Sequence, residues 1–223
     1  MSYLSWSNLV VGYPNKKSLT NPFSGEITFP GIYAIVGQNG CGKSTLLKTW
    51  LGLIKPLKGS VLFHDAPIPT EHNISQGIAY VPQFHAVNRY FHISVCDFIK
   101  QGKGPHYHFT EKDHQEIINL LSEWQLSGYE NRSFHNLSGG QKTRAMIVRA
   151  IISKPKMLFL DEPLASLDVC CQQQLMDTLE ELAHEHKVCI FIVDHHLENF
   201  KSYITKKISF TRKHDQEIST VVI

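Results

Sequence analysis

Short apolar runs that end in turn residues recur along the chain and predict β-strands. They read LVVGY, EITF, IYAIVG, SVLF, IAYVP, MLFLDEP and VCIFIVD. The runs at residues 32–37, 157–163 and 188–194 are continuous in apolar residues rather than alternating. Because a strand of a parallel sheet is covered on both faces, these three are predicted to be central strands of such a sheet. Two further β-prone runs around a polar turn, at residues 206–223, predict a hairpin.

A helical pattern follows the first of these central strands, after a glycine-rich turn. Leu47, Trp50, Leu51 and Ile54 recur at i, i+3, i+4 and i+7, which is the spacing of one helix face. Turn residues from Gly52 onward are predicted to end the helix and turn the chain. We therefore expect a strand, a turn and a helix in succession, with the helix packed on the sheet.

The middle of the chain has a different character, because β-like runs disappear there. Helical patterns cover residues 111–126 and 139–153, and a loop is expected at residues 101–110. The predicted organisation is one domain with an α/β core (residues 1–83 and 156–223) and an inserted helical lobe (residues 84–155).

The bulk composition narrows the class of protein. The chain has 223 residues, ordinary globular composition and a formal net charge of +2 without a basic stripe, so a nucleic-acid partner is not expected. Its five cysteines form no CxxC pair, which favours a reducing compartment such as the cytosol. No signal-like start or run of about 18 apolar residues occurs, so a membrane role would require a partner.

The glycine-rich turn after residues 32–37 fits a phosphate-binding loop. Its sequence GQNGCGKST satisfies GxxxxGK[ST] between a predicted strand and a predicted helix. Backbone N–H groups can face the phosphates, Lys43 can reach the β- and γ-oxygens, and Ser44 can hold Mg²⁺. A chance glycine turn is the alternative, and the context disfavours it. The predicted nucleotide-binding residues here are Gly37, Gln38, Asn39, Gly40, Cys41, Gly42, Lys43, Ser44 and Thr45.

Two adjacent acids end the predicted strand at residues 157–163. At a strand's end both carboxylates can reach one crevice, where Asp161 would hold Mg²⁺ and Glu162 would accept a proton from the attacking water. A helix cap or a solvated loop end is the alternative. His195 follows another buried strand, and a histidine alone in such a place is more often structural than catalytic.

A second glycine pair, in LSGGQ at residues 137–141, also has the features of a phosphate cradle. With GQNGCGKST and MLFLDEP in this order, the chain resembles the ATP-binding subunit of an ABC transporter over nearly its whole length. The resemblance implies an α/β P-loop NTPase (RecA-like) core with an antiparallel β subdomain and an inserted α-helical subdomain. It also implies ATP hydrolysis coupled to transport, with ATP and Mg²⁺ as cofactors. The Mg²⁺ would be held by Ser44, Gln83 and Asp161.

The resemblance assigns further roles residue by residue. Gln83 in AYVPQ matches the Q-loop and joins Lys43 and Glu162 as a residue expected in catalysis. His195 matches the switch histidine, which contacts the γ-phosphate, and SLD at residues 166–168 matches the D-loop. Tyr13 stands where an aromatic residue stacks on adenine, with a core or surface tyrosine as the alternative. The signature residues expected to bind nucleotide are Ser138, Gly139, Gly140 and Gln141.

The partners are also implied by the resemblance. Two subunits would pack head to tail, so that each ATP lies between the phosphate loop of one copy and the LSGGQ loop of the other. The chain would sit on the inner face of the cell membrane through a separate permease, whose cytoplasmic helix docks between core and helical lobe. An external solute-binding protein would complete the system.

The transported solute is suggested by the stretch after AYVPQ, whose spacing resembles the ATPase subunits of zinc, manganese and iron importers. The residues that carry this likeness are Phe91, Val95, Asp97 and Gly102, and those that depart from it are His92 and Ser94. Uptake of a metal chelate or another small solute stays open. A non-transport ABC ATPase is a further alternative, although no tandem cassette, coiled-coil insertion or basic surface supports it.

Smaller departures from the family concern the site itself. Cys41 stands where a small residue is usual, and we expect an exposed thiol near the phosphates that is sensitive to alkylation. His196 replaces the acid that commonly follows the switch histidine. The histidines of GPHYHF and HEH lack the three or four ligands of a structural zinc site, so no metal is expected on them.

Overall fold

The computed structural model describes residues 3–68, 77–83, 93–105, 107–195, 197–211 and 219–222. Its centre is a six-stranded sheet with the strand order β10-β9-β3-β8-β7-β6. The strands are β3 (Gly31–Gly37), β6 (Ile78–Val81), β7 (Met157–Asp161), β8 (Cys189–Val193), β9 (Ile204–Thr211) and β10 (Thr220–Val222). The strands from β9 to β6 are parallel, and β10 pairs with β9 in antiparallel fashion, as predicted for the tail.

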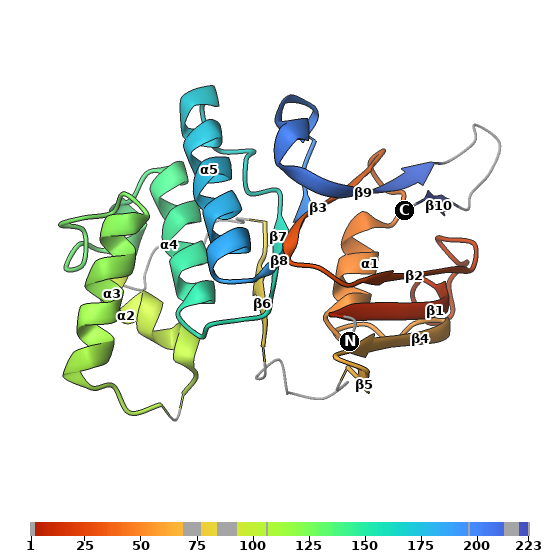
Figure 1. Ribbon diagram of the computed structural model, residues 1–223, viewed down its shortest axis with the longest axis horizontal. Helices are drawn as coiled ribbons and strands as arrows, with labels where there is room; N and C mark the ends of the chain where they lie inside the picture. Colours follow the sequence, from red (N-terminus) through yellow and green to blue (C-terminus); the bar gives the residue numbers. More distant parts are fainter. Residues whose placement is uncertain are drawn as a thin grey trace.

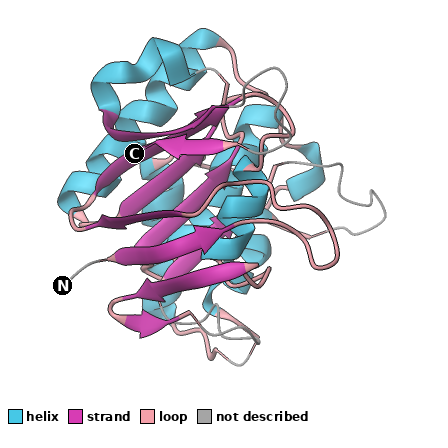
Figure 2. Cartoon of the chain, turned by 90° about the vertical axis from the view of Figure 1, so that its right-hand side faces the viewer, coloured by secondary structure: helices cyan, strands magenta, loops and turns pink. Residues whose placement is uncertain are grey.

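A second sheet is antiparallel and has the order β2-β1-β4-β5. Its strands are β1 (Leu4–Val10), β2 (Phe23–Ile27), β4 (Lys58–Phe63) and β5 (Ala66–Pro67). This sheet lies on the right of Figure 1 and Figure 2 views it with the central strands. The two sheets confirm the predicted α/β core with an antiparallel β part.

The helices are α1 (Lys43–Trp50), α2 (Val95–Lys100), α3 (Glu111–Glu123), α4 (Gly139–Ile151) and α5 (Val169–Glu185). Short 3₁₀ helices are η1 (Gln101–Lys103), η2 (Phe134–Asn136) and η3 (Leu197–Tyr203). In Figure 1, α2, α3 and α4 lie together on one side of the central sheet, and α1 lies on the other. The expected loop at residues 101–110 therefore begins with a turn of helix.

The central strands alternate between two buried layers. Leu158 and Leu160 of β7 pack in the core that contains α3, α4 and α5, whereas Met157 and Phe159 pack in the core shared with α1 and the antiparallel sheet. Because successive side chains point to opposite faces of a strand, a strand covered on both faces must be apolar at every position. The continuous apolar runs correctly predicted these central strands.

Contacts between aromatic rings fasten α1 to both sheets. The ring of Phe191 in β8 stacks on that of Phe159 with centroids 4.6 Å apart, and the Trp50 ring of α1 packs edge-on against it at 5.4 Å. Trp50 in turn lies 4.8 Å from the ring of Trp6 in β1. These contacts fix the last residue of α1 against both sheets, and the helix begins at the phosphate loop that follows β3.

The helix α1 is shorter than the apolar spacing predicts. It ends at Trp50, so that Ile54 lies beyond the helix. Gly52 adopts a left-handed conformation with a φ of 73°, and the N–H of Leu53 donates to the carbonyl of Lys48 at 2.9 Å. This is the glycine-dependent helix stop, which here overrides the continuing apolar pattern.

Candidate active site

The phosphate loop connects β3 to α1 and closes around the Lys43 ammonium. Lys43 Nζ donates hydrogen bonds to the carbonyl oxygens of Gly37 at 2.8 Å and of Gln38 at 2.9 Å. Gly40 and Gly42 have φ values of 75° and 111°, which side-chain-bearing residues rarely adopt. The loop thus turns back on itself so that two of its carbonyl groups hold the Lys43 ammonium.

The start of α1 suits an anion. Gly42 precedes the helix without a side chain to cap it, and the first turn carries no acidic residue. The first N–H groups of a helix lack partners within it and carry positive potential, so an uncapped start is suited to phosphate. Ser44 is exposed at this start, where its hydroxyl is available to a metal–phosphate complex.

Cys41 differs from the expectation of an exposed thiol. Its side chain is only 2% exposed and packs in the core beside Phe210 and α1. Ser219, next to β10, donates from its hydroxyl to the Cys41 carbonyl at 2.9 Å. This hydrogen bond stabilises the phosphate loop from a segment near the end of the chain. No local sequence pattern could reveal the contact, because 178 positions separate the two residues.

Three predicted residues meet at the end of β7. Glu162 Oε2 accepts a hydrogen bond from Gln83 Nε2 at 2.5 Å, and His195 Nε2 lies 3.7 Å from Glu162 Oε1. Glu162 itself has a φ of 51°, and its N–H donates to the Val193 carbonyl at 2.7 Å. A non-glycine residue held in the left-handed region is strained, and such residues cluster at functional sites.

Asp161 is half-buried and has a partner that the sequence did not indicate. The Tyr80 hydroxyl donates to Asp161 Oδ2 at 3.5 Å. Burial raises the pKa of Asp161, and the Glu162 charge raises it further, whereas Lys48, Tyr80 and Lys43 lower it. Burial also raises the pKa of Tyr80 to about 12, so its hydroxyl keeps the proton that it donates. A divalent cation at this carboxylate would relieve the repulsion between the two acids.

The LSGGQ loop is built as a helix start with a capping box. Ser138 caps α4, since its hydroxyl oxygen accepts from the N–H of Gln141 at 3.3 Å, and Gln141 Oε1 accepts from the N–H of Ser138 at 2.9 Å. Ser138 and Gly139 are exposed. A methyl group at Gly140 would lie 2.6 Å from Leu167, so the loop packs closely on the predicted D-loop.

The structure does not bring the two glycine loops together in one subunit. Residues of α1, such as Leu47, belong to the core on one face of the central sheet, and residues of α4, such as Ile147, belong to the core on the other. Figure 1 shows the same separation, with the sheet between the two helices.

Tyr13 and Ser94 belong to other segments of the described chain than the two acids. Tyr13 is 39% exposed in the segment between β1 and β2, whose Leu19 packs near Gly42. Ser94 caps α2 by accepting from the N–H of Asp97 at 3.0 Å. The departure from the importer pattern at Ser94 therefore has a clear structural use. Phe91, His92, His106 and His196 lie outside the described residues.

Two features are absent from the part of the chain that the structure describes. No group of three or more His, Cys, Asp or Glu side chains is placed to hold a metal ion. Within the same ranges, no helix is long and apolar enough to cross a membrane.

A phosphate loop between β3 and α1, with two acids at the end of β7, a parallel strand of the same sheet that β8 separates from β3, defines the P-loop NTPase class. Residues 20–165 match the family model described as ABC transporter. The chain therefore belongs to the ABC transporter family, as an ATP-binding domain that hydrolyses ATP.

Relatives and solved structures agree with this assignment. A probable metal transport system ATP-binding protein of Chlamydia trachomatis is 34% identical over 89% of this chain and 77% of its own length. The manganese transport system ATP-binding protein MntB of Listeria monocytogenes is 32% identical over 92% and 85%, and relatives named for import of molybdate and of spermidine/putrescine match at similar identity. An inward-facing metal-chelate type ABC transporter superposes with a TM-score of 0.79 at 30% identity, covering 94% of this chain and 80% of that one.

Proposed function

We propose that the chain powers import of a transition-metal ion, zinc, manganese or iron, through a separate membrane permease. The observation that carries the ATPase part of the proposal is the contact of the Glu162 carboxylate with both Gln83 and His195 at the end of β7. The names of the metal-transport relatives and the spacing of Val95, Asp97 and Gly102 support the solute.

In the proposed reaction, Glu162 accepts the proton of the attacking water. Lys43 exchanges its two carbonyl partners for phosphate oxygens, and His195 contacts the γ-phosphate. Ser44, Gln83 and Asp161 fit Mg²⁺, since all three offer oxygen ligands. Of the three side chains, Asp161 is partly buried and the other two are exposed. The ion would neutralise phosphate charge when bound.

Other residues would bind the phosphates and the adenine ring of the nucleotide. The backbone N–H groups of residues 37–45 would bind the phosphates. Tyr13, which is exposed, would stack on the adenine ring.

A second copy of the chain would complete each site. The Ser138 oxygen accepts from Gln141, so its hydroxyl hydrogen remains available to donate to a γ-phosphate across the interface. The N–H groups of Gly139 and Gly140 lie at the start of α4 and add to this cradle, next to the Gln141 side chain. Cleavage of ATP would remove the charge that both subunits hold, and so would favour opening of the dimer.

The permease would dock between the core and the helices of residues 84–155, which we propose to act as one subdomain. A cavity of about 510 Å³ lies there and is lined by Tyr80, Gln83, Phe98 and Met146. Because Tyr80 and Gln83 also contact the two acids at the end of β7, a segment bound in this cavity would reach the reaction centre through two side chains.

Uptake by cells that depend on this chain tests the solute. In cells that carry Lys43→Ala as their copy, we expect uptake of labelled zinc, manganese or iron to fall about a hundredfold, since Lys43 is the cation of the phosphate loop. Lys55→Ala, which changes an exposed lysine, is the matched control. Unchanged uptake of all three metals with lost uptake of molybdate or spermidine would refute the metal assignment and keep the transport role.

A further inference from the structure

The cavity between β6 and the helices has walls that differ in chemistry. Phe98 of α2 and Phe134 of η2 stack with ring centroids 4.0 Å apart, and Met146 of α4 continues this apolar wall. Gly102 allows η1 to touch α4, because a methyl group there would lie 1.9 Å from the carbonyl oxygen of Arg149. The apolar side therefore suits the apolar face of a helix or short segment.

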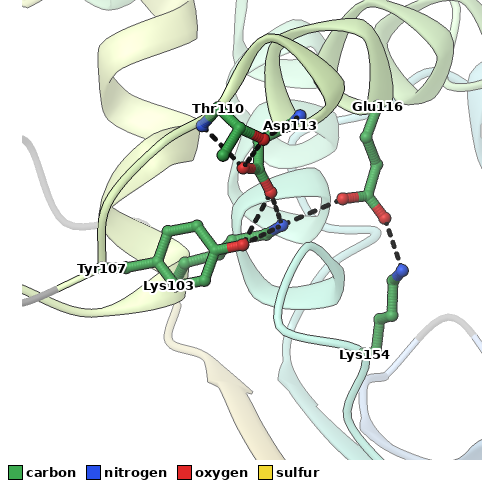
Figure 3. A network of polar contacts seen from close by, with 6 residues as sticks. All are labelled: Lys103, Tyr107, Thr110, Asp113, Glu116 and Lys154. Carbon is green, nitrogen blue, oxygen red and sulfur yellow. Dashed lines mark hydrogen bonds and ion pairs between the residues drawn. The ribbon is translucent and has the colours of Figure 1, made fainter.

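Two cations, Lys103 and Arg149, line the same cavity. The Lys103 ammonium is already neutralised, as Figure 3 shows. It contacts the carboxylate of Asp113 and lies 3.0 Å from Glu116 Oε2. The Tyr107 hydroxyl donates to Asp113 at 2.8 Å and closes the network. Because two carboxylates already neutralise its charge, Lys103 should attract a further anion only weakly.

Arg149 is placed differently. Its guanidinium carbon lies 4.9 Å from the centre of the Phe98 ring, and its side chain is exposed in the cavity. Among the described residues, no carboxylate pairs with it. The surrounding walls lower its pKa by excluding part of the water, yet the guanidinium keeps its charge at any physiological pH.

A segment that fills the cavity must cover this cation. Covering an arginine that has only an aromatic ring for a partner removes water without replacing its hydrogen bonds, which is costly. A carboxylate opposite the guanidinium replaces them, and the two groups can form parallel hydrogen bonds. Resting on the permease docking proposed above, we infer that the permease segment in this cavity carries an aspartate or glutamate that pairs with Arg149.

The experiment uses a photo-crosslinking amino acid, p-benzoylphenylalanine, in place of Gln101, an exposed residue of the cavity wall. The full-length chain is produced with a tag in the organism that encodes it, irradiated in membranes and digested, and crosslinked peptides are sequenced by mass spectrometry. We expect a peptide of an integral membrane protein that contains an Asp or Glu. Arg149→Gln should lower the crosslink yield about tenfold or more, and Arg149→Lys should lower it less. Lys112→Gln, at an exposed residue of α3 outside the cavity, should leave it unchanged.

Exchanging the two charges tests the ion pair directly. Arg149→Glu should abolish the crosslink, and changing the peptide's acidic residue to Arg in the same cells should restore it. A peptide without an acid, full yield from Arg149→Gln, or failure of the reversal to restore contact would overturn the ion pair while leaving permease docking intact. If a folded, ATP-hydrolysing chain crosslinks to no membrane protein, the docking proposal falls, and the ion pair falls with it.

Discussion

Replacing Glu162 by glutamine separates the geometry of the carboxylate from its chemistry. The amide has the same shape, and its oxygen can still accept the hydrogen bond that Gln83 donates at 2.5 Å. Since no buried group loses its partner, the free energy of unfolding should change by less than about 1 kcal/mol. The amide cannot accept a proton, however, so the step that needs a base should be the one affected.

The expected size follows from the role of a general base. Loss of such a base slows a reaction by about 10²- to 10⁴-fold, which corresponds to about 3 to 5.5 kcal/mol in the barrier. Removing the negative charge of Glu162 should also let the raised pKa of Asp161 fall, so Mg²⁺ affinity should not decrease. Phosphate release measures hydrolysis, and ATP affinity is measured separately by titration.

The same variant tests the shared site. With ATP and Mg²⁺ it should persist as a dimer in size-exclusion chromatography, because the triphosphate is not consumed. Glu181→Gln, at an exposed residue of α5, is the matched control and should behave like the wild type. If Glu162→Gln releases phosphate at the wild-type rate, Glu162 is not the base. If it binds ATP without turnover and remains a monomer, the interfacial arrangement is wrong.

Three further substitutions or reagents probe other parts of the molecule. Ser138→Arg should suppress hydrolysis while leaving the ATP affinity of the monomer within about twofold, and normal turnover in a phosphate-release assay would contradict the shared site. Phe191→Ala removes a fully buried ring of β8 and should lower stability to urea by about 3 to 5 kcal/mol, against less than about 0.5 kcal/mol for Val169→Ala, which is 77% exposed. N-ethylmaleimide should label the exposed Cys170 well before the buried Cys41, as intact-protein and peptide mass spectrometry would show; equal rates would refute the packed position of Cys41.

Much of the architecture could be predicted because its signals are local. Continuous apolar runs predicted β3, β7 and β8, and the motif GQNGCGKST fitted the turn into α1. Gly52 was predicted to help end the helix, and its left-handed conformation does follow the end of α1 at Trp50, which leaves only the last apolar position, Ile54, outside the helix. The helix α5, at residues 169–185, was not predicted, although Asp168 caps it by accepting from the N–H of Cys171 at 2.8 Å.

In the candidate site, too, some residues could be predicted from the sequence and others could not. Lys43, Glu162 and His195 stand in short motifs whose spacing reflects the chemistry of phosphate and water. Tyr80 stands in AYVPQ, but no role was predicted for it there. Its contact with Asp161 exists because β6 and β7 are parallel neighbours with Tyr80 beside Phe159.

The sequence by itself therefore determined the layers of the fold and the residue types that meet phosphate, since both depend on patterns within a few positions. Only the tertiary structure decided that Cys41 is buried, that Lys103 is neutralised while Arg149 is left facing a ring, and that the two glycine loops lie on opposite sides of the sheet. Such outcomes depend on which distant segments share a core or a cavity. Burial and pairing energies act between neighbours in space, and those neighbours are set by the packing of the whole chain.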